Sequence, residues 1–264
     1  MILKELKGHS GCKVYLCRDR KTKYVRKVSG SPSYNERLLI QIEKQKSFDN
    51  SYVRAPRVLR CGYNKGLVYF DMEYINGVPF NNYIHFNTIQ NIDPIFTKLS
   101  SFIKSNLSTT SDLTNAIHQK LDSINTGSLS VSRHKQYCLD FDWSKIECGY
   151  CHGDLTFENM LVYKGDVYLI DFLDSFINTP FIDCAKVLQD IVLRWSWRRS
   201  DITPFVKNIH LYDNLVRSLS EDEREIVKRL LVLNVLRIVP YTKEKTDVNF
   251  IQNALEYLES RFIK

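Results

Sequence analysis

Short apolar runs, separated by turn residues, dominate the first quarter of the chain. Residues 32–46 differ, because Leu38, Leu39 and Ile42 recur there on one side of a helix. The runs that predict strands are residues 6–17 (two strands around a turn), 24–28, 58–61 and 67–72. The pattern therefore predicts a strand-rich N-terminal region with one helix.

The remainder of the chain has mainly the period of helices. Apolar residues at helical spacing predict a buried helix around residues 95–103. Ser220 and Glu223 form a capping-box pattern that predicts the start of a helix, and Pro240 would end that helix. The polar stretch 105–111 is typical of a loop. Two further helices are predicted, at residues 180–188 and 247–262.

Composition narrows the class of protein. The 264 residues, 44% of them hydrophobic, can form one large domain or two lobes. The net charge of +7 favours anionic ligands, but the absence of a long Lys/Arg block argues against a nucleic-acid partner. Residues 1–6 are too short and charged for a secretory signal, and Lys228, Arg229 and Arg237 interrupt the longest apolar stretch, so no membrane span is expected. Seven scattered cysteines are typical of a reduced, cytoplasmic protein.

One stretch carries a chemical pattern. His152, Asp154 and Asn159 have the spacing H-x-D-x-x-x-x-N, which the catalytic loops of kinases share. Residues 161–170 predict a β-hairpin, which would bring Asp171 back beside Asn159. A carboxylate and an amide oxygen at one point suit Mg²⁺ held partly by phosphate oxygens. Asp154 would lie nearby, free to accept a proton from an attacking hydroxyl.

The paired motifs H-G-D-x-x-x-x-N and I-D-x-x-D resemble the aminoglycoside phosphotransferase and choline kinase-like family, which has the protein-kinase-like fold. Gly153 stands where protein kinases usually carry Arg, and Phe172-Leu173 replaces the Phe-Gly of D-F-G, as that family commonly does. The resemblance implies an α+β bilobal fold. Residues 1–76 would form a small antiparallel-sheet lobe over the nucleotide, and residues 77–264 a mainly helical lobe for catalysis and acceptor binding.

The resemblance also implies roles for the acidic residues. Asp154 would orient and deprotonate the acceptor hydroxyl, and Asn159 and Asp171 would hold Mg²⁺. Asp174 would assist the metal or lie just behind it. Asp183, in a D-x-A pattern, would support the catalytic loop from behind, or act as a first-turn acid of its helix.

In the N-terminal lobe the resemblance implies a nucleotide site. Lys27, with Arg26 as the alternative, would pair with the phosphates. Glu36 is preferred over Glu43 as its helix partner, although Ser33 and Glu36 also fit a capping box. The other nucleotide-binding residues implied are Ser10 and Gly11 in the first hairpin and Met72, Glu73 and Ile75 in a hinge.

The stretch 194–199 is unusual, and three interpretations remain open. It can be a helix with packed aromatic rings and a solvated basic face. Trp195 and Trp197 can instead form a substrate wall that holds a quaternary ammonium. Arg198 and Arg199 can also clamp an anionic group such as a sugar phosphate.

The implied reaction is transfer of the γ-phosphoryl group of ATP to a small-molecule hydroxyl, with GTP not excluded as donor. A sugar or sugar derivative of surface-polysaccharide metabolism is the favoured acceptor, because H-G-D-L-T-F-E-N is similar to proteins of such pathways. Choline or ethanolamine comes second, and the weakly basic C-terminal region disfavours a polycationic aminoglycoside. A protein kinase is disfavoured because no A-P-E-like element follows Asp171, and a nucleotide-binding pseudokinase because the key residues are present.

A competing motif also needs an interpretation. Cys148 and Cys151 with His152 match the c-type haem attachment pattern, and the pair alone is a C-x-x-C. Haem attachment requires export, and no signal peptide is visible, so no haem is expected. A redox dithiol remains the alternative to two cysteines that merely flank the strand before the catalytic loop.

Overall fold

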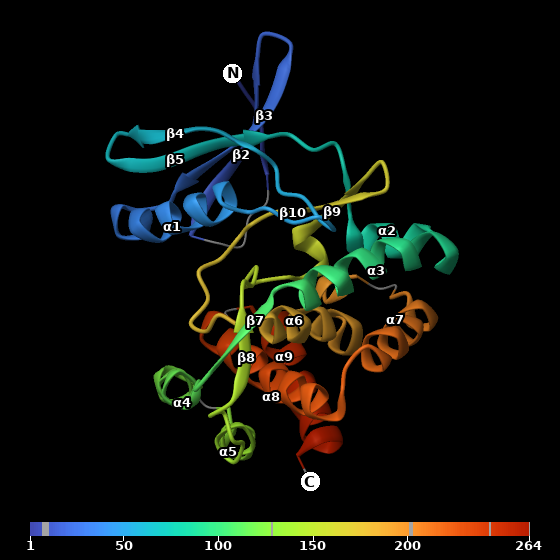
Figure 1. Ribbon diagram of the computed structural model, residues 1–264. Helices are drawn as coiled ribbons and strands as arrows, with labels where there is room; N and C mark the ends of the chain where they lie inside the picture. The colour runs from blue at the N-terminus through green and yellow to red at the C-terminus, as the bar shows by residue number, and fades with distance from the viewer. Residues whose placement is uncertain (7–10, 128, 201–202, 243, 264) are drawn as a thin grey trace.

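The computed structural model describes residues 1–6, 11–127, 129–200, 203–242 and 244–263. Figure 1 shows a sheet-rich part that contains the N-terminus and a larger helical part that contains the C-terminus. Within the described residues, none of the helices has the length and apolar character that crossing a membrane requires.

The N-terminal part is a five-stranded antiparallel sheet with the order β1-β2-β3-β5-β4. Hairpins connect β2 to β3 and β4 to β5, and the second of these was predicted from its two apolar runs. The turn predicted at residues 8–11 lies mostly outside the described residues. The sheet strands are β1 (Ile2–Leu6), β2 (Cys12–Asp19), β3 (Thr22–Ser29), β4 (Val58–Asn64) and β5 (Leu67–Glu73).

Helix α1 (Asn35–Lys46) follows a 3₁₀ turn and packs against β4 and β5, on the side of the sheet that faces the helical part (Figure 1). Leu38 and Ile42 have no exposed surface and form a small core with Phe70 and Met72 of β5. This buried stripe fixes the rotation of the helix about its axis, and therefore which polar side chains of α1 point toward the interior.

The C-terminal part is built around α6 (Pro180–Leu193) and α8 (Glu221–Ile238), which pack on each other and are largely buried. Thr179 caps α6 through its hydroxyl, and Pro180 occupies the first turn. The surrounding helices are α2 (Phe80–Phe86), α3 (Ile89–Ser105), α4 (Thr114–Ser123), α5 (Ser132–Leu139), α7 (Phe205–Arg217) and α9 (Lys245–Phe262).

Two small sheets flank the stretch that contains His152, Asp154 and Asn159. The predicted hairpin consists of β9 (Met160–Tyr163) and β10 (Asp166–Leu169), and β6 (Val78–Pro79) extends it. Arg54, in the connection after α1, donates its backbone N–H to Val167 and accepts from the N–H of Leu169. These bonds tie the end of the hairpin, and hence the following Asp171, to the N-terminal part.

Most predicted elements agree with the structure, and three differ. The capping box at Ser220 and Glu223 is present, but the one at Ser33 and Glu36 is absent because α1 begins without a side-chain cap. The polar stretch 105–111 is not a loop throughout, since β7 (Leu107–Ser111) pairs with β8 (Ile146–Gly149). Residues 195–197 form a 3₁₀ turn in place of a helix.

The sheet ends at Glu73 and β6 begins at Val78, so the predicted lobe boundary at 76 and 77 lies in this connection and remains an interpretation.

Candidate functional site

A buried histidine anchors the predicted catalytic loop, residues 152–159. The Nε2–H of His152 donates to the carbonyl oxygen of Ile170 over 2.9 Å, and its Nδ1 accepts the backbone N–H of Asp154 over 3.3 Å. The backbone N–H of Leu173 in turn donates to the carbonyl oxygen of His152. These bonds hold the loop against the segment that follows β10, so Asp154 and Asp171 share one region of the molecule.

Gly153 cannot carry a side chain here. Its φ is +92°, and a Cβ atom would lie 2.7 Å from the carbonyl oxygen of Leu173. Glycine, in place of the Arg that protein kinases usually carry, therefore allows the backbone at Gly153 to approach the backbone at Leu173. This contact brings the catalytic loop against the residues that follow Asp171.

Two buried aspartates support the loop from behind. Asp183 accepts the backbone N–H groups of His152 and Gly153 at 2.5 and 2.8 Å, and Asp190 accepts those of Phe157 and Ser196 at 2.5 and 2.7 Å. Burial raises the pKa of each carboxyl group to about 7, although the N–H donors act to lower it. Asp183 therefore has the structural position that was predicted, and Asp190 adds a second support that the sequence pattern did not reveal.

His152 should stay neutral far below the usual histidine range. Burial lowers its pKa to about 4, so protonation opposes folding by about 3 kcal/mol. This contribution to stability is complete above pH 6.5, decreases as the unfolded state takes up a proton, and is lost as the pH falls through about 4. Protonation of Asp183 and Asp190 has the opposite effect, because it favours the folded state as the pH falls below about 7. NMR of ¹⁵N-labelled histidine, assigned with a His152→Asn variant, should show the Nε2–H tautomer at pH 5. Titration of this ring between pH 6 and 7 would contradict the buried geometry.

Asp154 lies between a cation and an amide. Lys186 of α6 places its Nζ 3.0 Å from Oδ1, and the Nδ2–H of Asn159 donates to Oδ2 over 3.1 Å. Burial alone would raise the pKa of Asp154, but the charge and hydrogen bond of Lys186 hold it below the ordinary value. The carboxylate is therefore ionised at neutral pH and oriented on both of its oxygens.

Lys27 and Asp171 form an ion pair that joins the two parts of the molecule. The Lys27 ammonium is buried, contacts the Oδ1 atom of Asp171, and donates to the Oε1 atom of Gln41 over 3.0 Å. Burial acts to lower the pKa of Lys27, but the Asp171 carboxylate raises it above the ordinary value. Asp171 has a φ of +62°, a conformation that suits few residues other than Gly, Asn and Asp.

The predicted helix partner of Lys27 is wrong. Glu36 is exposed in the first turn of α1, and Glu43 is exposed and pairs with Lys46. Gln41 takes this position because it lies in the buried stripe of α1, whereas Glu36 lies about 140° away around the helix. Arg26, the alternative to Lys27, points to the other face of the sheet and pairs with Asp71.

The oxygen atoms that could hold Mg²⁺ come from adjacent backbone. The backbone N–H of Ile170 donates to the carbonyl oxygen of Asn159, so Asn159 and Asp171 are neighbours across the base of the hairpin. The Oδ1 atom of Asn159 makes no hydrogen bond to the described residues, since its Nδ2 group faces Asp154. Two hard oxygen donors fit a magnesium ion whose other ligands are phosphate and water. Asp174 is exposed, and no group of three or more acidic, His or Cys side chains in the described ranges is arranged to hold a metal.

The hinge residues occupy the end of β5 and the connection after it. Met72 packs in the α1 core and lies 3.6 Å from the Nε2 atom of Gln45. The backbone N–H of Glu73 donates to the carbonyl oxygen of Arg57, whereas the N–H of Ile75 makes no hydrogen bond to the described residues. A Cβ atom added to Gly11 would lie 3.0 Å from the ring of Tyr34, and Ser10 lies outside the described residues. Of the two predicted hinge amides, that of Ile75 therefore has no partner among the described residues.

The structure assigns the aromatic and basic stretch to packing and not to a substrate wall or clamp. Trp197 is buried against Phe157, and Trp195 contacts Arg198, whose guanidinium lies 4.1 Å from the ring centroid. Arg198 also pairs with Glu158, and Arg199 pairs with two acids of the α9 region. Both the ammonium-binding and the anion-clamp interpretations are therefore corrected, because these side chains already have partners.

The two cysteines of the C-x-x-C pattern are free and buried. Burial raises the pKa of the Cys148 thiol and raises that of Cys151 to about 12, so neither is a reactive thiolate at neutral pH. The Nε2 atom of His152 is bonded to a carbonyl oxygen and not free for iron. The structural interpretation of this motif, two cysteines beside the strand, is the one that fits.

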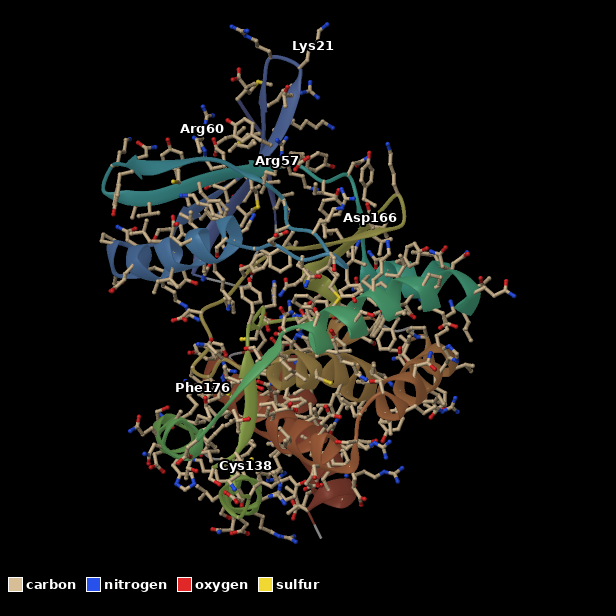
Figure 2. The ribbon with its side chains drawn as sticks, viewed as in Figure 1. Lys21, Arg57, Arg60, Cys138, Asp166 and Phe176 are labelled. Atoms are coloured by element: carbon tan, nitrogen blue, oxygen red, sulfur yellow. The ribbon has the colours of Figure 1, made fainter. Side chains whose placement is uncertain are left out.

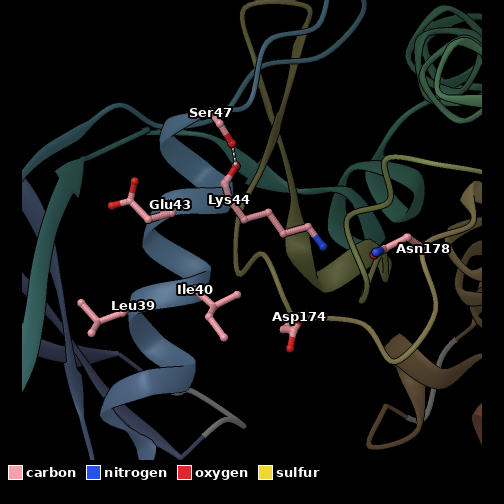
Figure 3. A pocket seen from close by; sticks show the side chains of 7 residues that line it. All are labelled: Leu39, Ile40, Glu43, Lys44, Ser47, Asp174 and Asn178. Carbon is pink, nitrogen blue, oxygen red and sulfur yellow. Dashed lines mark hydrogen bonds between the residues drawn. The ribbon is translucent and has the colours of Figure 1, made fainter. Parts of the chain in front are cut away.

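Two open cavities adjoin α1 on the side of the helical part. One, of about 550 Å³, is lined by Leu39, Ile40, Glu43, Lys44, Ser47, Asp174 and Asn178 (Figure 3). The other, of about 700 Å³, shares Lys44 and Asn178 and extends to Phe176. Lys44 donates to the carbonyl oxygen of Leu173 over 2.6 Å, so it links α1 to the segment after Asp171. The sequence pattern did not single out Lys44, Gln41 or Lys186, since each acts on a partner that is distant along the chain.

No family model matches the sequence, and no curated protein matches it. Solved structures do match in fold. An aminoglycoside phosphotransferase, APH(4)-Ia with ADP and hygromycin B, is 14% identical with a TM-score of 0.67, over 97% of this chain and 92% of that one. Choline kinase LicA from Streptococcus pneumoniae is 15% identical with a TM-score of 0.62, over 98% and 94%. The streptomycin–ATP complex of APH(2")-IIa is 16% identical with a TM-score of 0.62, over 96% and 90%. The chain therefore has the protein-kinase-like fold, as its motifs predicted.

Proposed function

We propose that the protein is a Mg²⁺-dependent phosphotransferase that moves the γ-phosphoryl group of ATP to a hydroxyl of a small molecule, with a sugar or sugar derivative as the favoured acceptor. The observation that carries the proposal is the pairing of Lys27 with Asp171 beside the hydrogen bond between Asn159 and Asp154. Structures of the same fold hold ADP with hygromycin B, or ATP with streptomycin, which supports a nucleotide and a small-molecule acceptor.

Each residue of the proposed site has a separate role in the reaction. Asp154 accepts the proton of the acceptor hydroxyl, whose oxygen bonds to the γ-phosphorus as the bond to the β–γ bridging oxygen breaks and ADP leaves. Lys27 pairs with the phosphates, and the Ile75 amide donates to the base of the nucleotide. Asn159 and Asp171 would hold Mg²⁺, which would neutralise charge on the phosphates. Catalysis here depends mainly on positioning and on charge neutralisation.

The test is a transfer screen. The protein is incubated with Mg-ATP or Mg-GTP and a panel of sugars, sugar phosphates, choline, ethanolamine and aminoglycosides, and product mass is followed. A product heavier by one phosphoryl group supports the proposal and identifies the acceptor class. Stabilisation by Mg-ATP without transfer would favour a pseudokinase, and the absence of both would contradict the proposal.

Lys186 should set the acid limit of activity. Because its ammonium holds the pKa of Asp154 below the ordinary value, the wild-type kcat should stay constant down to pH 5. Lys186→Met removes this charge while keeping most of the side-chain volume, and burial then raises the pKa of Asp154. The acid limb of the kcat profile should therefore move to higher pH in the variant. An unchanged profile would show that Asp154 is not the group whose ionisation the reaction needs.

A further inference from the structure

A single aromatic ring near Asp154 carries two cations. Phe176 lies in the segment between Asp171 and α6, on the side of the molecule where α4 is found (Figure 2). The Nζ atom of Lys120, from the last turns of α4, lies 5.9 Å from the ring centroid, and the guanidinium of Arg237, in the last turn of α8, lies 4.8 Å from it. Three segments that are distant in sequence therefore bring two positive charges to one ring.

These two cations lie beside the predicted catalytic loop. The backbone N–H of Leu173, three residues before Phe176, donates to the carbonyl oxygen of His152. Helix α8, which carries Arg237, packs on α6, whose Lys186 contacts Asp154. Burial lowers the pKa of both Lys120 and Arg237, and repulsion from Arg237 lowers that of Lys120 further. Lys120 and Arg237 are called the basic cluster below.

The basic cluster is not neutralised by the protein. In the described parts of the chain, no carboxylate lies within ion-pair distance of Lys120 or Arg237, and Arg237 donates only to the Oδ1 atom of Asn234, over 3.1 Å. Asp154 is already paired with Lys186. Other arginines of the same region have acidic partners, as Arg198 has in Glu158 and Arg229 in Glu225. Half-buried cations that repel one another without a counter-ion favour the binding of an anion.

We propose that the acceptor carries an anionic group, a phosphate or a carboxylate, which the basic cluster binds while a hydroxyl of the same molecule faces Asp154. This inference rests on the proposed function and names its substrate class. Phe176 cannot serve as a binding face for a quaternary ammonium, because cations of the protein already lie against its ring. A cationic acceptor, such as choline or an aminoglycoside, would be repelled by the same charges. The anionic group takes no part in bond making, and the hydroxyl oxygen alone gains the phosphoryl group as ADP leaves.

The experiment compares acceptors that differ only in charge. Binding of glucose and glucuronate, and of mannose and mannose 1-phosphate, is measured by calorimetry on protein saturated with Mg-ADP, and transfer from Mg-ATP is measured for the same pairs. The anionic member of a pair should bind at least tenfold more tightly and show a correspondingly higher kcat/KM. Equal or tighter binding of the neutral members, or of choline or kanamycin, would overturn the proposal.

Substitutions test whether Lys120 and Arg237 cause the preference for the anionic acceptor. Arg237→Met and Lys120→Met keep an aliphatic chain against Phe176 and remove one charge each, so each should weaken binding of the anionic member about tenfold and leave the neutral member unchanged. Arg217→Met is the matched control, because Arg217 is exposed at the end of α7, on the opposite side of the helical part from α4 (Figure 1). An equal loss for both members of a pair, or the same loss in the control, would contradict the assignment.

Failure of this inference can be separated from failure of the proposed function. Hydrolysis of Mg-ATP by water and thermal stabilisation by Mg-ATP depend on Lys27, Asn159 and Asp171, not on the basic cluster. If both persist and neutral acceptors are preferred, the phosphotransferase stands and only the anionic acceptor is refuted. If neither is observed with wild-type protein, the nucleotide site itself is refuted.

Discussion

Asp171→Asn should lower kcat for phosphoryl transfer on the order of 10³-fold while the protein remains folded. Asparagine keeps the size of the side chain and an oxygen that can accept from Lys27, but it removes the charge that a magnesium site and the buried ammonium need. Asparagine also tolerates the φ of +62°, which alanine would adopt at a cost. The measurements are kcat as a function of Mg²⁺ concentration and the thermal unfolding midpoint.

The matched control for Asp171→Asn is Asp166→Asn. Asp166 is a half-exposed carboxylate at the start of β10, labelled in Figure 2, and it pairs with Arg54 and Lys98. Its loss should change kcat less than twofold, since surface ion pairs contribute little. Wild-type kcat for Asp171→Asn at saturating Mg²⁺ would remove Asp171 from the metal site.

Asp154→Asn should lower kcat by about 10²- to 10⁴-fold with little change in KM for ATP. The amide oxygen can still accept from Lys186 or from Asn159, although the NH₂ group then faces the other donor, and the amide cannot take a proton from the acceptor. The residual activity should lose the acid limb that ionisation of Asp154 produces. A loss confined to KM for ATP would instead show that Asp154 serves nucleotide binding. Asp171→Asn and Asp154→Asn both keep the size of the side chain. A folding defect in either variant would appear as a lower thermal unfolding midpoint in the absence of nucleotide.

Local sequence signals were reliable where one element contains all of the information. The hairpin was predicted because two apolar runs flank Lys164 and Gly165, and both turn residues have positive φ in the structure. The capping box of α8 was readable because its two partners are three residues apart. The strand β7 was not readable, since its polar residues form a strand only by pairing with β8.

Errors arose where a role depends on the rotation of an element or on a distant partner. Glu36 was preferred on its place in the sequence, but the buried stripe of Leu38 and Ile42 turns it outward and turns Gln41 toward Lys27. Trp195 and Arg198 looked like a recognition surface, but they satisfy each other in a tight turn. In both cases the sequence shows the residue types, but it does not show which residues they contact in the folded protein.

The sequence by itself determined the chemistry of the loop: the spacing of His152, Asp154 and Asn159, the hairpin that returns the chain at Asp171, and the sheet and helices on either side. These follow from chain connectivity and side-chain period, which act over a few residues. Only the tertiary structure decided that Lys27 meets Asp171 across 144 positions, that Lys186 contacts Asp154, and that two cations lie against Phe176. Such contacts depend on how buried apolar faces pack and rotate whole elements, and no local pattern records that rotation.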